Sequence, residues 1–136
     1  MTATPEQLQL MLFDGAIRFA EQGRAGLEAK QYDVSYDRLS RAQQIVSELS
    51  VTLREEHDAD TCKRLKSLYT FIYLRLVDAN VEHEVKAVDE ALQVLRYQRE
   101  TWLMLMKQRA DDVASGNGES VLRVEARPAQ RLSLAG

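Results

Sequence analysis

The chain has few residues of the types that most often bind metals or act as nucleophiles. It contains two histidines, His57 and His83, and one cysteine, Cys62. Di-iron carboxylate bundles use Glu-x-x-His pairs, but Arg54 and Asn80 occupy the positions three residues before the two histidines. A single cysteine excludes an internal disulfide and a Cys-x-x-Cys-His haem attachment. The sequence also lacks Gly-x-Gly-x-x-Gly, a phosphate loop and His-Glu-x-x-His. We therefore expect no metal site, no cofactor and no enzymatic activity.

One alternative use of His83 has to be considered. The segment from His83 to Ala87 resembles the phosphorylatable His-x-x-Lys-Gly pattern of histidine phosphotransfer domains, which are also four-helix bundles; Lys86 matches, and Ala87 replaces the glycine. Such a domain requires an exposed histidine in the middle of a helix, whereas the helical pattern places His83 at a junction between helices. The position of His83 in the fold therefore decides between a phosphoacceptor and a solvated loop residue.

Length and charge limit the class of protein. A chain of 136 residues is long enough for one domain with a core. Its formal net charge of −3 argues against an electrostatic nucleic-acid binder, which would normally be basic. Residues 1–6 have neither the basic region nor the apolar core of a signal peptide, and no apolar run reaches the length of a membrane span. We expect a cytoplasmic protein that does not insert into membranes.

Helical periodicity divides the chain into four segments. Thr4 can cap the first helix, Pro5 suits its first turn and Gln7 completes a capping box, so this helix is expected to run to about Lys30. We expect Asp33 to cap the second helix, which should end near His57. Asp60 should cap the third helix, and the fourth should begin near Val85.

The expected inward-facing residues recur at spacings of three and four. They are Leu39, Ala42, Val46, Leu49 and Leu53 in the second helix, Leu65, Leu68, Tyr69, Ile72, Leu76 and either Ala79 or Asn80 in the third, and Val85, Val88, Leu92, Leu95, Arg99, Trp102 and Met106 in the fourth. The short connections favour antiparallel neighbours. The sequence therefore predicts an all-α fold, an antiparallel up-and-down four-helix bundle over residues 1–114. Residues 115–136 are expected to form a C-terminal tail that is either flexible or docked in a groove of the bundle.

The first helix carries apolar residues on two faces. The stripe expected to face the core consists of Leu8, Met11, Leu12, Gly15, Phe19 and Gly23. A second stripe, Leu10, Phe13 and Ile17, lies on an adjoining face. A small bundle seldom covers both faces of one helix, so one face is a candidate for a partner. In the third helix, Phe71 and Tyr73 cannot both face the core, which indicates a further exposed apolar surface.

Arg99 is the exceptional residue of the fourth helix, because a charge at a core position is costly unless it is paired. We expect its aliphatic part to pack while the guanidinium reaches a carboxylate at the edge of the bundle. Asp14 and Asp78, both flanked by apolar residues, are the first candidates.

Four motifs occur in a fixed order along the chain. They are Thr4–Leu8 with Met11–Ile17, Leu39–Val46, Leu68–Asn80, and Leu95–Trp102. In this order and spacing, the chain resembles the FliS family of flagellar secretion chaperones from about Thr4 to Lys107. Two departures are that only three residues precede Thr4, where family members usually have a longer arm, and that the residues after Val113 do not align.

This resemblance implies a four-helix bundle that binds flagellin without catalysis. The disordered C-terminal region of flagellin would form amphipathic helix on the apolar surface of the bundle, as in helix-in-groove recognition. Family analogy also implies delivery of the complex to the export-gate protein FlhA. The residues expected to contact flagellin are Leu10, Phe13, Ile17, Ile45, Tyr73, Val77 and Asn80. The alternative is that they pack under the tail or a neighbouring helix.

Overall fold

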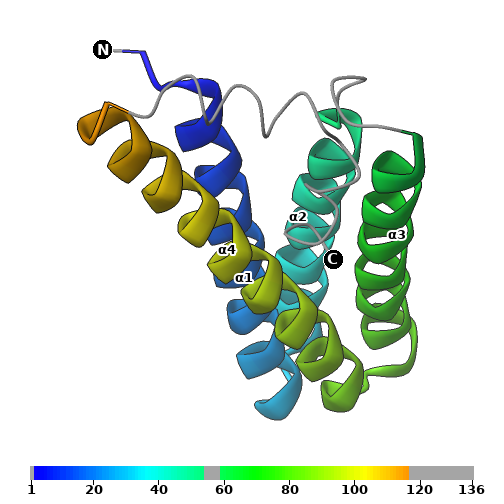
Figure 1. Cartoon of the computed structure of the whole chain (residues 1–136). Coiled ribbons are helices and arrows are strands. Elements are labelled where there is room, and N and C mark those ends of the chain that lie inside the picture. Colours follow the sequence, from blue (N-terminus) through cyan, green and yellow to red (C-terminus); the bar gives the residue numbers. More distant parts are fainter. Residues whose placement is uncertain (1, 54–58, 117–136) are drawn as a thin grey trace.

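A computed structural model describes residues 2–53 and 59–116 (Figure 1). Its four helices are α1 (Pro5–Glu28), α2 (Tyr32–Val51), α3 (Ala59–Glu82) and α4 (Val85–Ala114). Consecutive helices run in opposite directions, and α1 and α3 each contact both α2 and α4 (Figure 1). The predicted all-α, antiparallel up-and-down four-helix bundle is confirmed. The predicted tail lies outside the described residues from position 117 onward.

The start of α1 follows the predicted capping box. The amide of Gln7 donates to Oγ1 of Thr4 at 3.1 Å, and the amide of Thr4 donates to Oε1 of Gln7 at 2.9 Å. These two bonds satisfy backbone donors that have no partner within the helix. The helix ends at Glu28, slightly before the expected end, and Lys30 follows in the left-handed region with φ 57°.

Three predicted boundaries differ from the structure. Gln31, not Asp33, precedes α2, and it makes no side-chain capping bond. Asp33 and Asp60 instead lie within the first turns of α2 and α3, where a carboxylate favours the positive end of the helix dipole. The second helix ends at Val51 rather than near His57, because the chain turns there and Leu53 packs against the core. His57 itself lies outside the described residues.

The core runs between all four helices. Its fully covered large side chains come from α2, α3 and α4, namely Leu39, Val46, Leu49, Ile72, Leu76, Val88, Leu92 and Leu95. These residues were all expected to face inward, and their burial confirms the periodicity of the three helices. Burying each of them contributes about 1.5–3 kcal/mol relative to exposure.

The inward face of α1 was predicted in part: Gly15 and Gly23 are buried, and Leu12 and Phe19 pack against the core. Leu8 and Met11 were expected in the core but are 51% and 60% exposed, whereas Phe13, Ala16 and Ala20 are buried. The expectation that Phe13 faces outward is therefore wrong, since only 2% of this residue is exposed. The reason is that α1 approaches its neighbours closely, so small residues such as Ala16 and Ala20 take many of the interior positions beside Phe13.

Two glycines allow this close approach of α1 to α2. A Cβ on Gly26 would lie 2.9 Å from the backbone nitrogen of Ser35, and a Cβ on Gly23 would lie 2.5 Å from the Leu39 side chain. Because backbone cannot move aside as a side chain can, the contact at Gly26 fixes the spacing of the two helices at this end.

Candidate functional site

The α1/α4 seam is closed by polar contacts. Nε of Arg99 donates to Oδ1 of Asp14 at 2.5 Å, which confirms Asp14 as the partner expected for this arginine. Asp78, the other candidate, instead accepts from Arg75 at 2.8 Å, and Arg75 also pairs with Glu90. The Arg99 side chain remains 32% exposed. Arg99 therefore lies at the edge of the bundle, as the sequence predicted.

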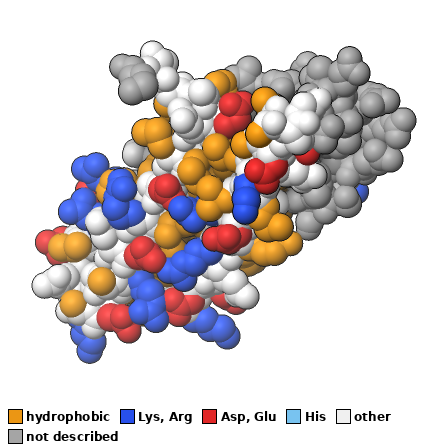
Figure 2. All heavy atoms as spheres, turned by 60° about the vertical axis from the view of Figure 1, so that its left-hand side comes forward, with side chains coloured by type: hydrophobic (Ala, Val, Ile, Leu, Met, Phe, Trp, Pro, Cys, Tyr) orange, Lys and Arg blue, Asp and Glu red, His pale blue; other side chains and the backbone are white. Residues whose placement is uncertain are grey.

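Further contacts follow the same seam in antiparallel order. They are Arg24 with Asp89, Arg96 with Glu21, and the indole N–H of Trp102 donating to the carbonyl oxygen of Glu6. Figure 2, in which the left-hand side of Figure 1 comes forward, shows charged side chains over the lower part of this face and hydrophobic side chains gathered in its upper half. The seam is thus occupied by contacts within the chain.

The second stripe of α1 lies along this seam. Leu10 and Ile17 are half-buried, and Ile17 packs against the core. They stand four residues before and three residues after Asp14, so they share the side of α1 that faces α4. Leu10 and Ile17 thus share one side of α1, and Ile17 packs against the core there.

Ile45 lies at a different seam, between α1 and α2. Its Cδ1 atom is 3.1 Å from the position of a Cβ on Gly15, and the side chain is half-buried against the core. The candidate residues of α1 and α2 therefore do not form one continuous surface with those of α3.

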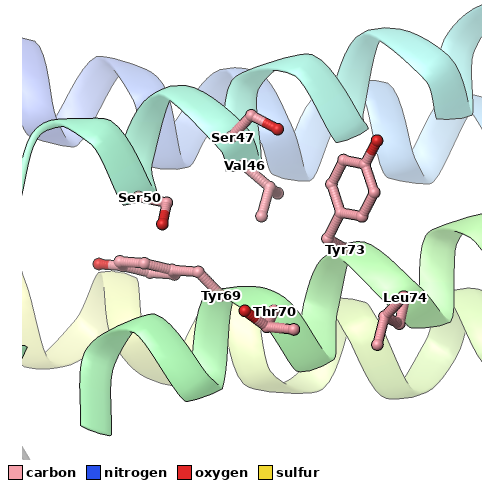
Figure 3. Close-up of a pocket in the computed structure, with 7 residues that line it drawn as sticks. All are labelled: Val46, Ser47, Ser50, Tyr69, Thr70, Tyr73 and Leu74. Atoms are coloured by element: carbon pink, nitrogen blue, oxygen red, sulfur yellow. The ribbon is translucent and has the colours of Figure 1, made fainter. Parts of the chain in front are cut away.

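The remaining candidates meet at the α2/α3 seam. A shallow depression there is lined by Val46, Ser47 and Ser50 of α2 and by Tyr69, Thr70, Tyr73 and Leu74 of α3 (Figure 3). Tyr73 reaches from α3 toward α2, whereas Leu74 points away from α2 (Figure 3). The walls combine hydroxyl groups with apolar side chains. This composition suits a segment that buries apolar groups and keeps some polar contacts.

Asn80 continues the seam beyond the depression. Its amide nitrogen donates to Oε1 of Gln43 at 2.9 Å and to Oγ of Ser40 at 3.5 Å, while its Oδ1 atom is buried without a hydrogen-bond partner within the described residues. Val77, one turn before on the same side of α3, is half-buried. The structure therefore brings Tyr73, Val77 and Asn80 together along one side of α3.

Exposed apolar residues continue around α3 from this side, with Leu74 and Val81 53% and 72% exposed. Phe71 is 43% exposed, which confirms the expected apolar surface on α3, but it lies on the opposite side of the helix from Asn80. Sequence reasoning missed Leu74 and Val81. The signal was available, because both share a helical row with Val77 at spacings of three and four.

Tyr69 forms the inner wall of the depression. Only 3% of the residue is exposed. Burial raises the pKa of its phenol to about 12, because the tyrosinate would lose its hydration. The phenol therefore stays neutral near pH 7 and acts here as an apolar wall.

His83 does not have the environment of a phosphoacceptor. It lies in the link between α3 and α4, with φ 57°, and its ring stacks on that of Tyr32 with centroids 3.8 Å apart and planes at 4°. A histidine phosphotransfer domain requires its phosphoacceptor in the middle of a helix, and His83 lies between two helices. The phosphotransfer alternative is therefore not favoured.

The described part of the chain shows neither a metal-binding cluster nor a membrane-spanning helix. Within residues 2–53 and 59–116, no group of three or more His, Cys, Asp or Glu side chains is placed to hold a metal ion. Over the same ranges, no helix has both the length and the apolar character needed to cross a membrane.

These features define a small helical-bundle protein with exposed apolar side chains along its α2/α3 pair. The family profile described as "Flagellar protein FliS" matches residues 1–109. The chain is 32% identical to the flagellar secretion chaperone FliS of Salmonella typhimurium, covering 75% of this chain and 76% of the relative. It is 28% identical to the corresponding chaperone of Bacillus subtilis, covering 85% and 86%. The chain belongs to the FliS family of flagellar secretion chaperones, which is not a class of enzymes.

Proposed function

We propose that this chain is a cytoplasmic export chaperone that binds the C-terminal region of flagellin. It prevents premature polymerisation and hands flagellin to the flagellar type III export apparatus. The observation that carries the proposal is the exposed apolar surface along α2 and α3 in a member of the FliS family. Leu74 and Val81 present this surface to solvent. Apolar residues so placed favour burial against an amphipathic partner.

In this proposal, Tyr73, Val77 and Asn80 contact flagellin directly. Tyr73 lines the depression, and Asn80 has a buried oxygen that could accept a hydrogen bond if the side chain shifted. Leu10, Ile17 and Ile45 support the helices from the neighbouring seams. Phe13 contributes only indirectly, by packing in the core, since 2% of this residue is exposed.

The energetics of this binding are a balance of two terms. Each large apolar side chain buried contributes about 1.5–3 kcal/mol. Ordering each residue of a disordered segment costs roughly 1–2 kcal/mol in backbone entropy. The ordering cost therefore offsets much of the gain from burial, and only the difference between the two terms remains as affinity. Finite affinity is what a chaperone requires if the export-gate protein FlhA is to receive the flagellin, as family analogy proposes.

The proposal is tested by seeded polymerisation of flagellin, followed by light scattering. An equimolar amount of the chaperone should suppress filament growth. Leu74→Asp should weaken the suppression at least tenfold, because a carboxylate in an apolar interface is costly to desolvate. Tyr97→Asp on α4 is the matched control, since Tyr97 is 59% exposed and Leu74 is 53% exposed. Growth at an unchanged rate in an excess of the wild-type chain would contradict the proposal.

A further inference from the structure

A second apolar surface lies where the α1–α2 and α3–α4 links meet, at the lower end of the bundle in Figure 1. Tyr32 begins α2 and is 41% exposed, although its ring stacks on that of His83. The stack holds His83 in the left-handed region, at φ 57°. Non-glycine residues visit this region infrequently, so the link has a defined conformation supported by an aromatic contact.

The exposed apolar area continues on both sides of this stack. Tyr36, one turn after Tyr32 on the same side of α2, is 65% exposed, and Val81 of α3 is 72% exposed. The hydrogen bond from Asn80 to Ser40 places the end of α3 beside this row of α2. We call the set of Tyr32, Tyr36, Val81, Glu82, His83 and Glu84 the turn-end surface.

The charge of this surface differs from that of the adjacent helices. Several nearby carboxylates are paired with arginines: Glu28 and Asp89 with Arg24, Asp37 with Arg38 and Arg41, and Asp78 and Glu90 with Arg75. Within residues 2–53 and 59–116, Glu82 and Glu84 form no salt bridge, although Lys30 and Lys86 are exposed at the same end. The hydrogen bond and the repulsion from Glu84 raise the pKa of Glu82. Glu82 thus lies close to Glu84, and the nearby charge of Arg75 only partly opposes this rise.

We propose that the turn-end surface binds an arginine-bearing segment of a partner protein. The guanidinium would lie on the exposed aromatic rings of Tyr32, Tyr36 or His83 and would pair with the carboxylates of Glu82 and Glu84. Arginine suits both elements, because its planar group stacks on aromatic faces and binds carboxylates through two parallel hydrogen bonds. Val81 supplies an apolar contact for the flanking residues of the segment.

This surface is separate from the depression at the α2/α3 seam. Tyr32 and Ser50 lie at opposite ends of α2, roughly 27 Å apart at a rise of 1.5 Å per residue. A ligand confined to the depression would leave the turn-end surface accessible, and the two surfaces proposed for binding share only Val81. A partner could therefore engage both surfaces, or two partners could bind at once.

The test is a titration of the full ¹⁵N-labelled chain, followed by NMR, with the peptide acetyl-Ala-Arg-Ala-Ala-Arg-Ala-amide. A matched peptide with citrulline in place of arginine keeps the shape and removes the charge. We expect saturable shifts of the amides of Tyr32, Tyr36 and His83 with the arginine peptide. Glu82→Gln/Glu84→Gln should weaken this binding at least tenfold, whereas the control Glu48→Gln/Glu100→Gln, on exposed positions elsewhere, should leave it unchanged.

Several results would overturn the proposal. Equal binding of the citrulline peptide would show that charge is not recognised. Shifts spread over all acidic faces, or unaltered binding to Glu82→Gln/Glu84→Gln, would show that this surface is not selected. Shifts of the same amides on simple dilution, without peptide, would assign the surface to a second copy of the chain. The glutamine variants keep the shape of exposed side chains, and unchanged circular dichroism confirms that they fold.

Discussion

Asp14 of α1 and Arg99 of α4 are 85 residues apart in sequence, yet Nε of Arg99 donates to Oδ1 of Asp14 at 2.5 Å. The pair joins the first and the last helix of the bundle at a point where both side chains remain partly exposed. Beyond it toward the C-terminus, α4 contains no fully buried residue. The pair therefore marks the boundary between the closed core and the looser end of the α1/α4 seam.

A double-mutant cycle with Asp14→Ala and Arg99→Ala measures what this pair contributes. We expect a coupling free energy of about 0.2–1 kcal/mol, because partly exposed ion pairs are screened by solvent. Urea denaturation of the four proteins gives this value. A coupling above about 3 kcal/mol would mean that the pair behaves as a buried salt bridge.

The close approach of α1 to α2 predicts a difference between two glycines. Gly26→Ala should lower the free energy of unfolding by about 1–3 kcal/mol, because its Cβ would meet the Ser35 backbone at 2.9 Å. Gly15→Ala meets only the mobile Cδ1 atom of Ile45 at 3.1 Å, so the gain in helix propensity of about 1 kcal/mol should compensate. Thermal or urea unfolding of both variants measures the two changes in the free energy of unfolding. Equal losses of stability would contradict the contact assigned between Gly26 and the Ser35 backbone.

The two apolar positions Ile17 and Leu74 should respond differently to a charge. Ile17→Asp should destabilise the fold by about 1–3 kcal/mol, because Ile17 packs against the core at the α1/α4 seam. Leu74→Asp should change stability by less than about 0.5 kcal/mol and should reduce flagellin binding, since Leu74 is 53% exposed. Circular dichroism melts and binding titrations of both variants provide the comparison. A stable Ile17→Asp variant that loses flagellin binding would show that the flagellin-binding site includes α1.

Tyr69 predicts a dependence of stability on alkaline pH. Its pKa is raised from 10.0 to about 12 by burial, so the folded state holds its proton more tightly than the unfolded state. The stabilisation is fully present below pH 10 and is lost as the pH rises toward about 12. Urea unfolding at pH 9 and at about pH 11 should show a smaller decline for Tyr69→Phe than for the wild type. Tyr97→Phe is the exposed control, and a decline unaltered by Tyr69→Phe would exclude the buried phenol as its source.

The helices of this chain were predictable because their apolar residues recur with a clear helical period. Leu39, Leu76 and Leu92 are buried as expected. In the first helix this reasoning succeeded only in part, because hydrophobicity favoured Leu8 and Met11, while interhelical distance selected Ala16 and Ala20. Residue spacing cannot report how closely two helices approach.

The candidate site was harder to predict for the same reason. Tyr73, Val77 and Asn80 share one side of α3 as expected, but Ile17 and Ile45 lie at other seams. A stripe on one helix is fixed by sequence spacing, whereas a surface made by two helices depends on how each is rotated about its axis. That rotation is set by packing over the whole bundle.

The most direct test of the proposed function is calorimetry with two flagellins, one complete and one lacking its C-terminal segment. The account predicts one-to-one binding of the complete protein with a negative heat-capacity change, as expected for burial of apolar surface. It predicts no measurable binding of the truncated protein. Equal affinity for both flagellins would contradict the claim that this chain recognises the C-terminal region.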